Sequence, residues 1–140
     1  MLYNEAFFGL NSYGRIATGL GFGSVKNQKI IKSLLEQYET LSFLNEDGTL
    51  NLTTNTMHEE PVFQKYGLKQ KDVLQEIGGA YVFPSDFMSP QLPGFATYKI
   101  SCNTVSVHHN GFSWGSQKQR DDLGKSGSSY EMIRYRFEND

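Results

Sequence analysis

Apolar residues recur along this chain with spacings that predict helices and short strands. The clearest helix covers residues 26–41, where one apolar stripe repeats at helical spacing and consists of Ile30, Ile31, Leu34, Leu35, Tyr38 and Leu41. Ser24 or Asn27 is expected to cap its start. We expect this helix to pack against a sheet and to contribute no residue to the chemistry.

Compact apolar runs between turn residues predict the strands. Residues 6–10 form the first, and residues 74–83 predict a hairpin around Gly78-Gly79, which can adopt the positive φ angles of a tight turn. Residues 103–107 contain three β-branched side chains, so we expect a buried strand that ends at His108 and His109. Cys102, the only cysteine, is expected to be buried beside this strand.

A second helix is predicted for residues 57–66. Thr56 and Glu59 have the spacing of a capping box, which would place Pro61 in the opening turn, and Gly67 would end the helix. Proline residues from position 84 onward predict a long loop before residue 98. Asp86 is the best candidate for a ligand contact in that loop, and the alternative is a solvated turn aspartate.

Composition narrows the class of protein. The 140 residues, 38% of them hydrophobic, are enough for one globular domain with a hydrophobic core. The net charge of −2 without a basic stripe argues against a nucleic-acid partner, and no apolar run is long enough for a transmembrane segment. Because no signal peptide is recognisable at the N-terminus, we expect a cytoplasmic location. The aromatic content of 14% suits either packed sheets or a sugar-binding surface.

Two stretches carry candidate chemistry. Residues 18–24 alternate glycine with larger residues, but their spacing matches neither a dinucleotide-binding loop nor a P-loop, so a structural and a binding role both stay open. The second stretch contains His108, His109, Ser113 and Trp114. Imidazoles can bind a divalent metal, and a hydroxyl and an indole N–H can donate to an anion. The alternative is a strand end with a core tryptophan.

Four stretches together carry a resemblance to a known family. They are residues 6–9, residues 18–23 with the helix at 30–38, residues 47–54, and residues 81–85 leading to Asn103-Thr104 and His108-His109-x-x-x-Ser113-Trp114. In this order they resemble the C-terminal half of bacterial sugar transferases with a DXD motif, related to capsular-polysaccharide and initiating mannosyltransferase-like enzymes. The likeness covers roughly residues 5–114.

The resemblance implies an α/β fold, the C-terminal part of a GT-A-like nucleotide-diphospho-sugar transferase, with a mixed sheet and flanking helices. Residues 1–114 would form this portion, and residues 115–140 a polar tail whose last residues form either a strand or a helix. The sequence contains no Asp-x-Asp. We therefore expect the nucleotide-binding βαβ half to be missing, and we expect these residues alone to transfer no sugar.

The resemblance also implies partners and residue roles. A nucleotide-sugar donor, a glycan acceptor and Mn²⁺ or Mg²⁺ would take part in polysaccharide biosynthesis. His109 or His108 would approach the metal or the diphosphate, and Ser113 and Trp114 would donate to phosphate oxygens. The glycine-rich strand with Thr18, Gly19 and Gly21 would line the sugar pocket, and residues 51–54 would lie near the acceptor.

Two other functions remain as alternatives. The first is a non-catalytic module that binds a glycan or a protein and self-associates through the face left by the missing half. The second is a metal-dependent hydrolase that uses His108 and His109. We discount the hydrolase because no further carboxylate or histidine follows at ligand spacing.

Overall fold

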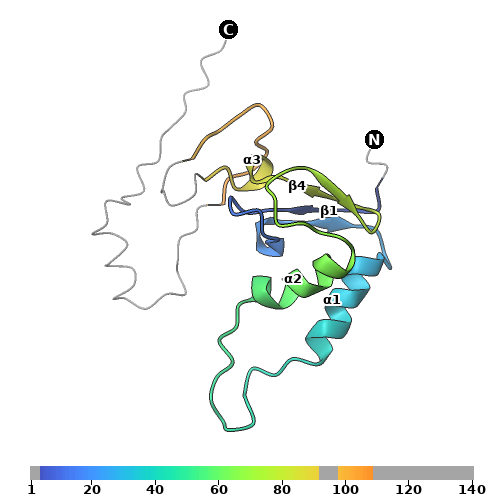
Figure 1. Cartoon of the computed structure of the whole chain (residues 1–140), viewed down its shortest axis with the longest axis vertical. Helices are drawn as coiled ribbons and strands as arrows, with labels where there is room; N and C mark the ends of the chain where they lie inside the picture. The colour runs from blue at the N-terminus through green and yellow to red at the C-terminus, as the bar shows by residue number, and fades with distance from the viewer. Residues whose placement is uncertain (1–3, 92–97, 109–140) are drawn as a thin grey trace, which may run out of the picture.

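The computed structural model describes residues 4–91 and 98–108, which form a mixed four-stranded sheet with two longer helices on one side (Figure 1). The strands are β1 (Ala6–Gly9), β2 (Gly23–Ser24), β3 (Gln75–Ile77) and β4 (Ala80–Phe83), and their order in the sheet is β2-β1-β4-β3. The helices are α1 (Lys29–Glu39), α2 (Asn55–Lys65) and the short α3 (Ser85–Met88), and a 3-10 turn, η1, covers Thr18–Leu20. The α/β class with a mixed sheet is confirmed.

The central pair of the sheet is parallel. Ala6 to Gly9 of β1 lie opposite Ala80 to Phe83 of β4 in register. The outermost strands are β2, antiparallel to β1, and β3, antiparallel to β4. A parallel pair needs a long crossover, and here it contains η1, β2, α1, α2 and β3. The predicted strand at residues 6–10 is therefore confirmed, with Leu10 forming only an isolated bridge to Ile16.

The predicted hairpin at residues 74–83 is also confirmed. Ile77 pairs with Ala80, and the two turn residues between them, Gly78 and Gly79, have φ angles of 52° and 74°. Positive φ at both central residues is the requirement of the tight turn that matches strand twist. A side chain at Gly78 would also collide with Tyr66 of the C-terminal end of α2, 2.9 Å from its Cβ position.

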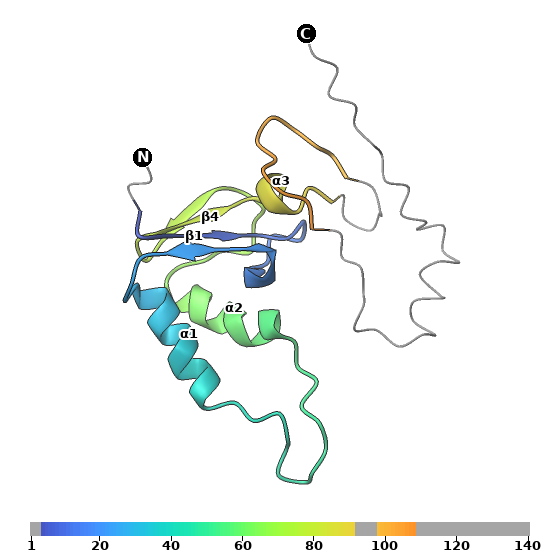
Figure 2. The same cartoon turned by 180° about the vertical axis from the view of Figure 1, so that it is seen from behind.

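The hydrophobic core lies between the sheet and the layer of α1 and α2, which Figure 2 shows from behind. Phe8 of β1 is fully buried and meets Phe63 of α2 edge to face, with ring centroids 4.8 Å apart. Ile30 and Leu34 of α1 are buried in the same cluster. Ile31 is partly buried against this cluster, whereas Leu35 is 61% exposed and Tyr38 41% exposed, so the predicted burial of Leu35 and Tyr38 is wrong.

Helix α1 begins at a different cap from either predicted residue. The buried side chain of Gln28 accepts hydrogen bonds from the backbone N–H groups of Ile30 (2.7 Å) and Ile31 (3.2 Å), and its Nε2 donates to the carbonyl of Gly78 (2.8 Å). The hydroxyl of Ser24 instead donates to the neighbouring carbonyl of Val25. Gln28 therefore both caps α1 and fastens it to the β3–β4 turn, a long-range contact that local sequence does not reveal.

Helix α2 confirms its predicted end but not its predicted start. Gly67, with φ of 99°, follows the last turn, and the N–H groups of Gly67 and Leu68 donate to the carbonyls of Gln64 and Phe63. The helix starts at Asn55, however, so Pro61 lies in its interior. The capping box is wrong as well, because the Glu59 side chain points away from the helix start toward other elements.

Residues 18–24 do not form the continuous glycine-rich strand that we expected. They divide into η1 and the two-residue strand β2. Only Gly23 shows the close approach predicted for strand glycines, since a Cβ there would run into the Phe7 ring across the β1–β2 pair.

The strand expected at residues 103–107 is absent from the described structure. Val105 is 73% exposed, and Cys102, expected to be buried, is also exposed. The reason is that residues 101–108 bond to α3 and its side chains instead of joining the sheet. The loop predicted after Pro84 is interrupted by α3.

The cap at Gln28 can be tested by substitution. We expect Gln28→Ala to lower the free energy of unfolding by about 2 kcal/mol, because it removes the helix cap and leaves the Gly78 carbonyl without its donor. Urea unfolding measures the loss. Ser24→Ala is the control and should change stability by less than about 0.5 kcal/mol; equal losses in the two variants would contradict the assignment of the cap.

Candidate functional site

The carboxyl ends of β1 and β4 meet at one edge of the sheet, the place where α/β proteins commonly bind ligands. There the Leu10 N–H donates to the Phe83 carbonyl (2.9 Å). Gly9 lies between η1 and α3: a Cβ on it would stand 3.6 Å from Leu20 Cδ1 and 2.9 Å from Met88 Sδ. The sheet edge therefore brings η1 and α3 together.

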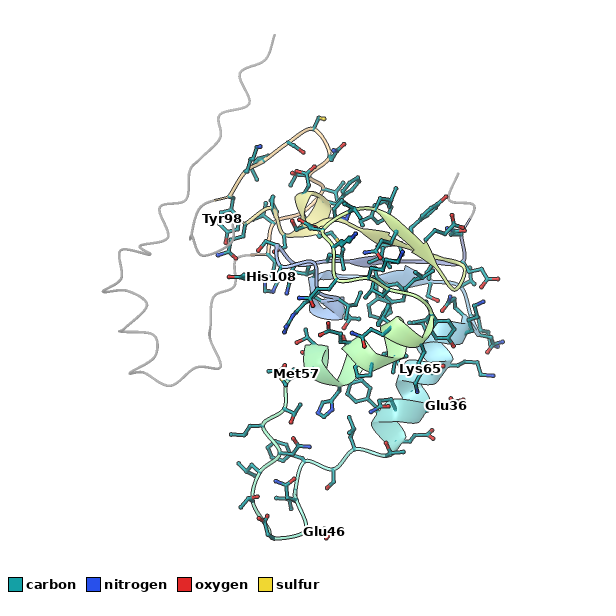
Figure 3. All side chains as sticks on the ribbon, in the orientation of Figure 1. Glu36, Glu46, Met57, Lys65, Tyr98 and His108 are labelled. Atoms are coloured by element: carbon teal, nitrogen blue, oxygen red, sulfur yellow. The ribbon has the colours of Figure 1, made fainter. Side chains whose placement is uncertain are left out.

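Residues 98–108 lie against the same edge. The N–H groups of Val105 and Ser106 donate to the Phe87 carbonyl, and that of His108 donates to the Met88 carbonyl (3.3 Å). Figure 3 shows Tyr98 beside His108, and the Tyr98 hydroxyl donates to the His108 carbonyl. His108 thus lies near the strand ends even though no strand leads to it. Its predicted partners His109, Ser113 and Trp114 lie outside the described residues, so their roles stay predictions.

The three predicted sugar-pocket residues are placed by η1. Gly21 has a φ of 123°, a conformation that favours glycine. Gly19 has no such constraint, and nothing lies within 4 Å of its Cβ position. The fold therefore gives no packing reason for a glycine at position 19, which leaves a ligand-facing role open. The hydroxyl of Thr18 points inward and donates to Glu59.

Asp86 anchors residues 98–108 to α3. Its Oδ2 accepts hydrogen bonds from the Ser101 hydroxyl (2.8 Å) and from the Asn103 amide (3.0 Å), while its carbonyl accepts from the Thr104 hydroxyl. The bond from Ser101, followed by that from Asn103, holds the pKa of Asp86 below its usual 3.8. These bonds occupy Oδ2 of the carboxylate, so the observed role of Asp86 is structural, and its contact with a ligand stays a prediction.

The described residues do not fit the hard divalent cation that the family resemblance implies. Mn²⁺ and Mg²⁺ prefer several oxygen ligands. Within residues 4–91 and 98–108, no three His, Cys, Asp or Glu side chains come together as a metal-binding group. We therefore assign no metal-dependent step to them.

Glu59 is a buried carboxylate that connects three segments. It comes from α2 and is only 5% exposed. Both of its oxygens accept from the Thr18 hydroxyl of η1 (2.8 and 2.9 Å), and Oε1 also accepts from the Tyr38 hydroxyl of α1 (3.2 Å). Burial, then the charge of Glu59 and this hydrogen bond, raise the pKa of Tyr38 above its usual value of 10.0.

A groove opens beside this carboxylate, between the end of α1 and the start of α2. Its volume is about 310 Å³, at the lower end of the range of small-molecule sites. The lining combines apolar or aromatic side chains with hydroxyl, amide and imidazole groups, and it consists of Tyr38, Leu41, Ser42, Phe43, Asn51, Thr53, Asn55 and His58. None of these lining side chains is a carboxylate, lysine or arginine.

The outer wall of the groove is a projecting hairpin of residues 41–54, which we call the arm. The backbone N–H of Asn51 donates to the Phe43 carbonyl (2.8 Å), Leu44 bridges Leu50, and the turn at residues 45–48 closes the tip. Figure 3 shows Glu46 at this tip and Met57 in the first turn of α2, just after the arm. Phe43 is 66% exposed, so its ring is available to a ligand.

Sequence reasoning found this site only in part. Asn51 and Thr53, from the segment 51–54 that the resemblance implies to lie near the acceptor, line the groove, and their contact with an acceptor stays a prediction. Sequence reasoning missed Tyr38, which was interpreted as part of a packing stripe, and Glu59, which was interpreted as a helix-start acid. The sequence does show one signal: Tyr38 is a polar aromatic residue near the C-terminal end of the apolar stripe, shortly before an arm rich in hydroxyl and amide groups.

Comparison of the chain with family models, with curated proteins and with solved structures found no match. Among the described helices, none has the length and apolar character needed to cross a bilayer.

The Asp86 anchor has a predictable pH dependence. Because the pKa of Asp86 is lowered by folding, its contribution is complete above pH 3.8 and is lost as the pH falls through the lower folded value. We expect Asp86→Asn to weaken the anchor at neutral pH too, so that the amides of Val105 and Ser106 lose hydrogen-exchange protection. Asp47→Asn is the control, since Asp47 has a similarly lowered pKa but accepts its hydrogen bonds from Thr49 at the arm tip. Unchanged protection in Asp86→Asn would contradict the anchoring role.

Proposed function

We propose that this chain is the acceptor-side part of a sugar transferase that acts in polysaccharide biosynthesis, and that its groove binds a neutral glycan. The observation that carries the proposal is the lining of the groove, which joins exposed aromatic rings to hydroxyl and amide groups without a charged carboxylate or amine. A sugar ring offers an apolar C–H face to an aromatic ring and hydroxyls to amides. The described lining contains no lysine or arginine that would bind a phosphate.

The family resemblance supports the transferase part of this proposal, together with a GT-A-like fold. In such an enzyme the nucleotide-sugar and its Mn²⁺ or Mg²⁺ would be bound on the donor side, where the loss of the nucleoside diphosphate needs charge stabilisation. His108 lies at the sheet edge from which it could approach that side. The groove would hold the glycan whose hydroxyl accepts the sugar.

Glycan binding can be tested with the chain itself. We expect the purified protein to bind neutral oligosaccharides on a glycan array, and we expect Phe43→Ala and Asn55→Ala each to weaken binding roughly tenfold, because each loses a wall contact of about 1–1.5 kcal/mol. Tyr13→Ala is the matched control, since Tyr13 is 61% exposed but does not line the groove. Absence of binding, or equal losses in Phe43→Ala and Tyr13→Ala, would refute the proposal.

A specific observation also favours the alternative of a binding module that self-associates. The sheet face opposite α1 and α2 presents Phe7, Tyr81 and Phe83, each only half-buried, and Phe83 contacts both other rings. A continuous aromatic face of this kind is typical of interaction surfaces. In this alternative a second copy of the chain would cover the face.

Sedimentation velocity distinguishes the alternative. If self-association occurs through this face, the wild-type chain sediments as a dimer or larger and Tyr81→Lys sediments as a monomer. The introduced lysine lies opposite Glu76 in the β3–β4 pair, so the sheet itself should tolerate it. A wild-type chain that stays monomeric at high concentration would exclude self-association through this face.

A further inference from the structure

Within the described part of the chain, Glu59 accepts hydrogen bonds from two hydroxyl groups, those of Thr18 and Tyr38. Burying a carboxylate away from water is costly unless donors satisfy it. Each of these hydroxyls comes from a different element, so the carboxylate fixes the relative position of η1, α1 and α2 around the groove. That arrangement also fixes where the hydroxyl protons are.

A hydroxyl group has one proton and two lone pairs, whereas an ionised carboxylate only accepts. The Tyr38 proton is therefore directed to Glu59, and so is the Thr18 proton, which both carboxylate oxygens share. Tyr38 lines the groove. Its oxygen can accept a hydrogen bond from a ligand there, but it has no proton left to donate.

We propose that Glu59 is a specificity-determining positioning residue: by holding the Tyr38 proton, it makes the Tyr38 oxygen an obligatory acceptor that selects a ligand hydroxyl. The inference rests on the proposed glycan function and deepens it, because it names the group that the groove recognises, a sugar O–H that donates. A phosphate or carboxylate ligand, which can only accept, gains nothing at this position. By the same reasoning Thr18 cannot donate to a phosphate while Glu59 is ionised.

Glu59→Met tests this inference at nearly constant volume. The thioether accepts only weakly and does not donate, so the Tyr38 hydroxyl loses its acceptor and its proton becomes available to a ligand. The groove would keep its shape but lose its requirement for a donating ligand.

The probes are methyl glycosides of glucose, galactose and mannose, each with its monodeoxy and monodeoxyfluoro analogues. Fluorine can accept weakly but cannot donate. For wild type we expect one position at which the deoxy and the fluoro analogues both bind roughly fivefold to tenfold more weakly than the parent. In Glu59→Met the fluoro analogue should recover relative to the deoxy analogue, because the Tyr38 hydroxyl can then donate to fluorine. In Tyr38→Phe, a second variant that keeps Glu59, the parent and deoxy sugars should bind equally.

A ligand-free measurement separates this inference from the proposed function. In a tyrosine titration, with Tyr38→Phe used to identify the signal, Glu59→Met should shift the pKa of Tyr38 back toward 10.0, because the charge and the hydrogen bond of Glu59 both raise it. If no glycoside binds the wild-type protein, the proposed function fails and this inference with it. If glycosides bind but the Tyr38 titration is the same in Glu59→Met, or the fluoro analogue does not recover in that variant, the inference alone is overturned.

Discussion

The parallel pairing of β1 with β4 is the constraint on which the rest of this structure depends. Two parallel neighbours cannot be joined by a tight turn, so the chain between Gly9 and Ala80 must cross over one face of the sheet. The helices α1 and α2 lie in that crossover and bury Phe8 and Val82 beneath them. The same pairing brings the carboxyl ends of both strands to one edge, where η1, α3 and residues 98–108 gather.

The Glu59 carboxylate connects the carboxyl ends of the strands with the groove. It accepts hydrogen bonds from the hydroxyl of Thr18, beside the strand ends, and from the hydroxyl of Tyr38, which lines the groove. A hydrophobic side chain of similar volume would fill the same space without the cost of burying a carboxylate. We therefore explain the carboxylate at this position by its effect on the hydroxyl protons of Thr18 and Tyr38, and hence on ligand recognition, and not by a contribution to stability.

The sequence predicted those parts of the fold that depend on interactions between residues near one another in the chain. The Gly78-Gly79 hairpin and the Gly67 helix end follow from backbone conformations that glycine adopts readily, and α1 follows from its apolar spacing. Prediction from the sequence failed where a hydrogen bond to a residue distant in the chain sets the local conformation. Residues 103–107 have strand-forming side chains, yet they form hydrogen bonds with Asp86 and with the backbone carbonyls of α3 instead of joining the sheet. Gln28 caps α1 in a position that is fixed by the hydrogen bond from its amide to the distant Gly78 carbonyl. The groove combines Tyr38 of α1 and His58 of α2 with residues of the arm, and local sequence does not show that these segments meet.

The arm also divides the chain in a way that matters for engineering. β1, β2 and α1 precede it, and α2, β3 and β4 follow it, yet β1 pairs with β4 and the two parts share one core. Each part alone would expose half of that core. A break in the backbone at the exposed turn of residues 45–48 would therefore yield two fragments that fold only when they meet. Reassembly of the two fragments would also rebuild the groove, because its lining includes residues from both of them.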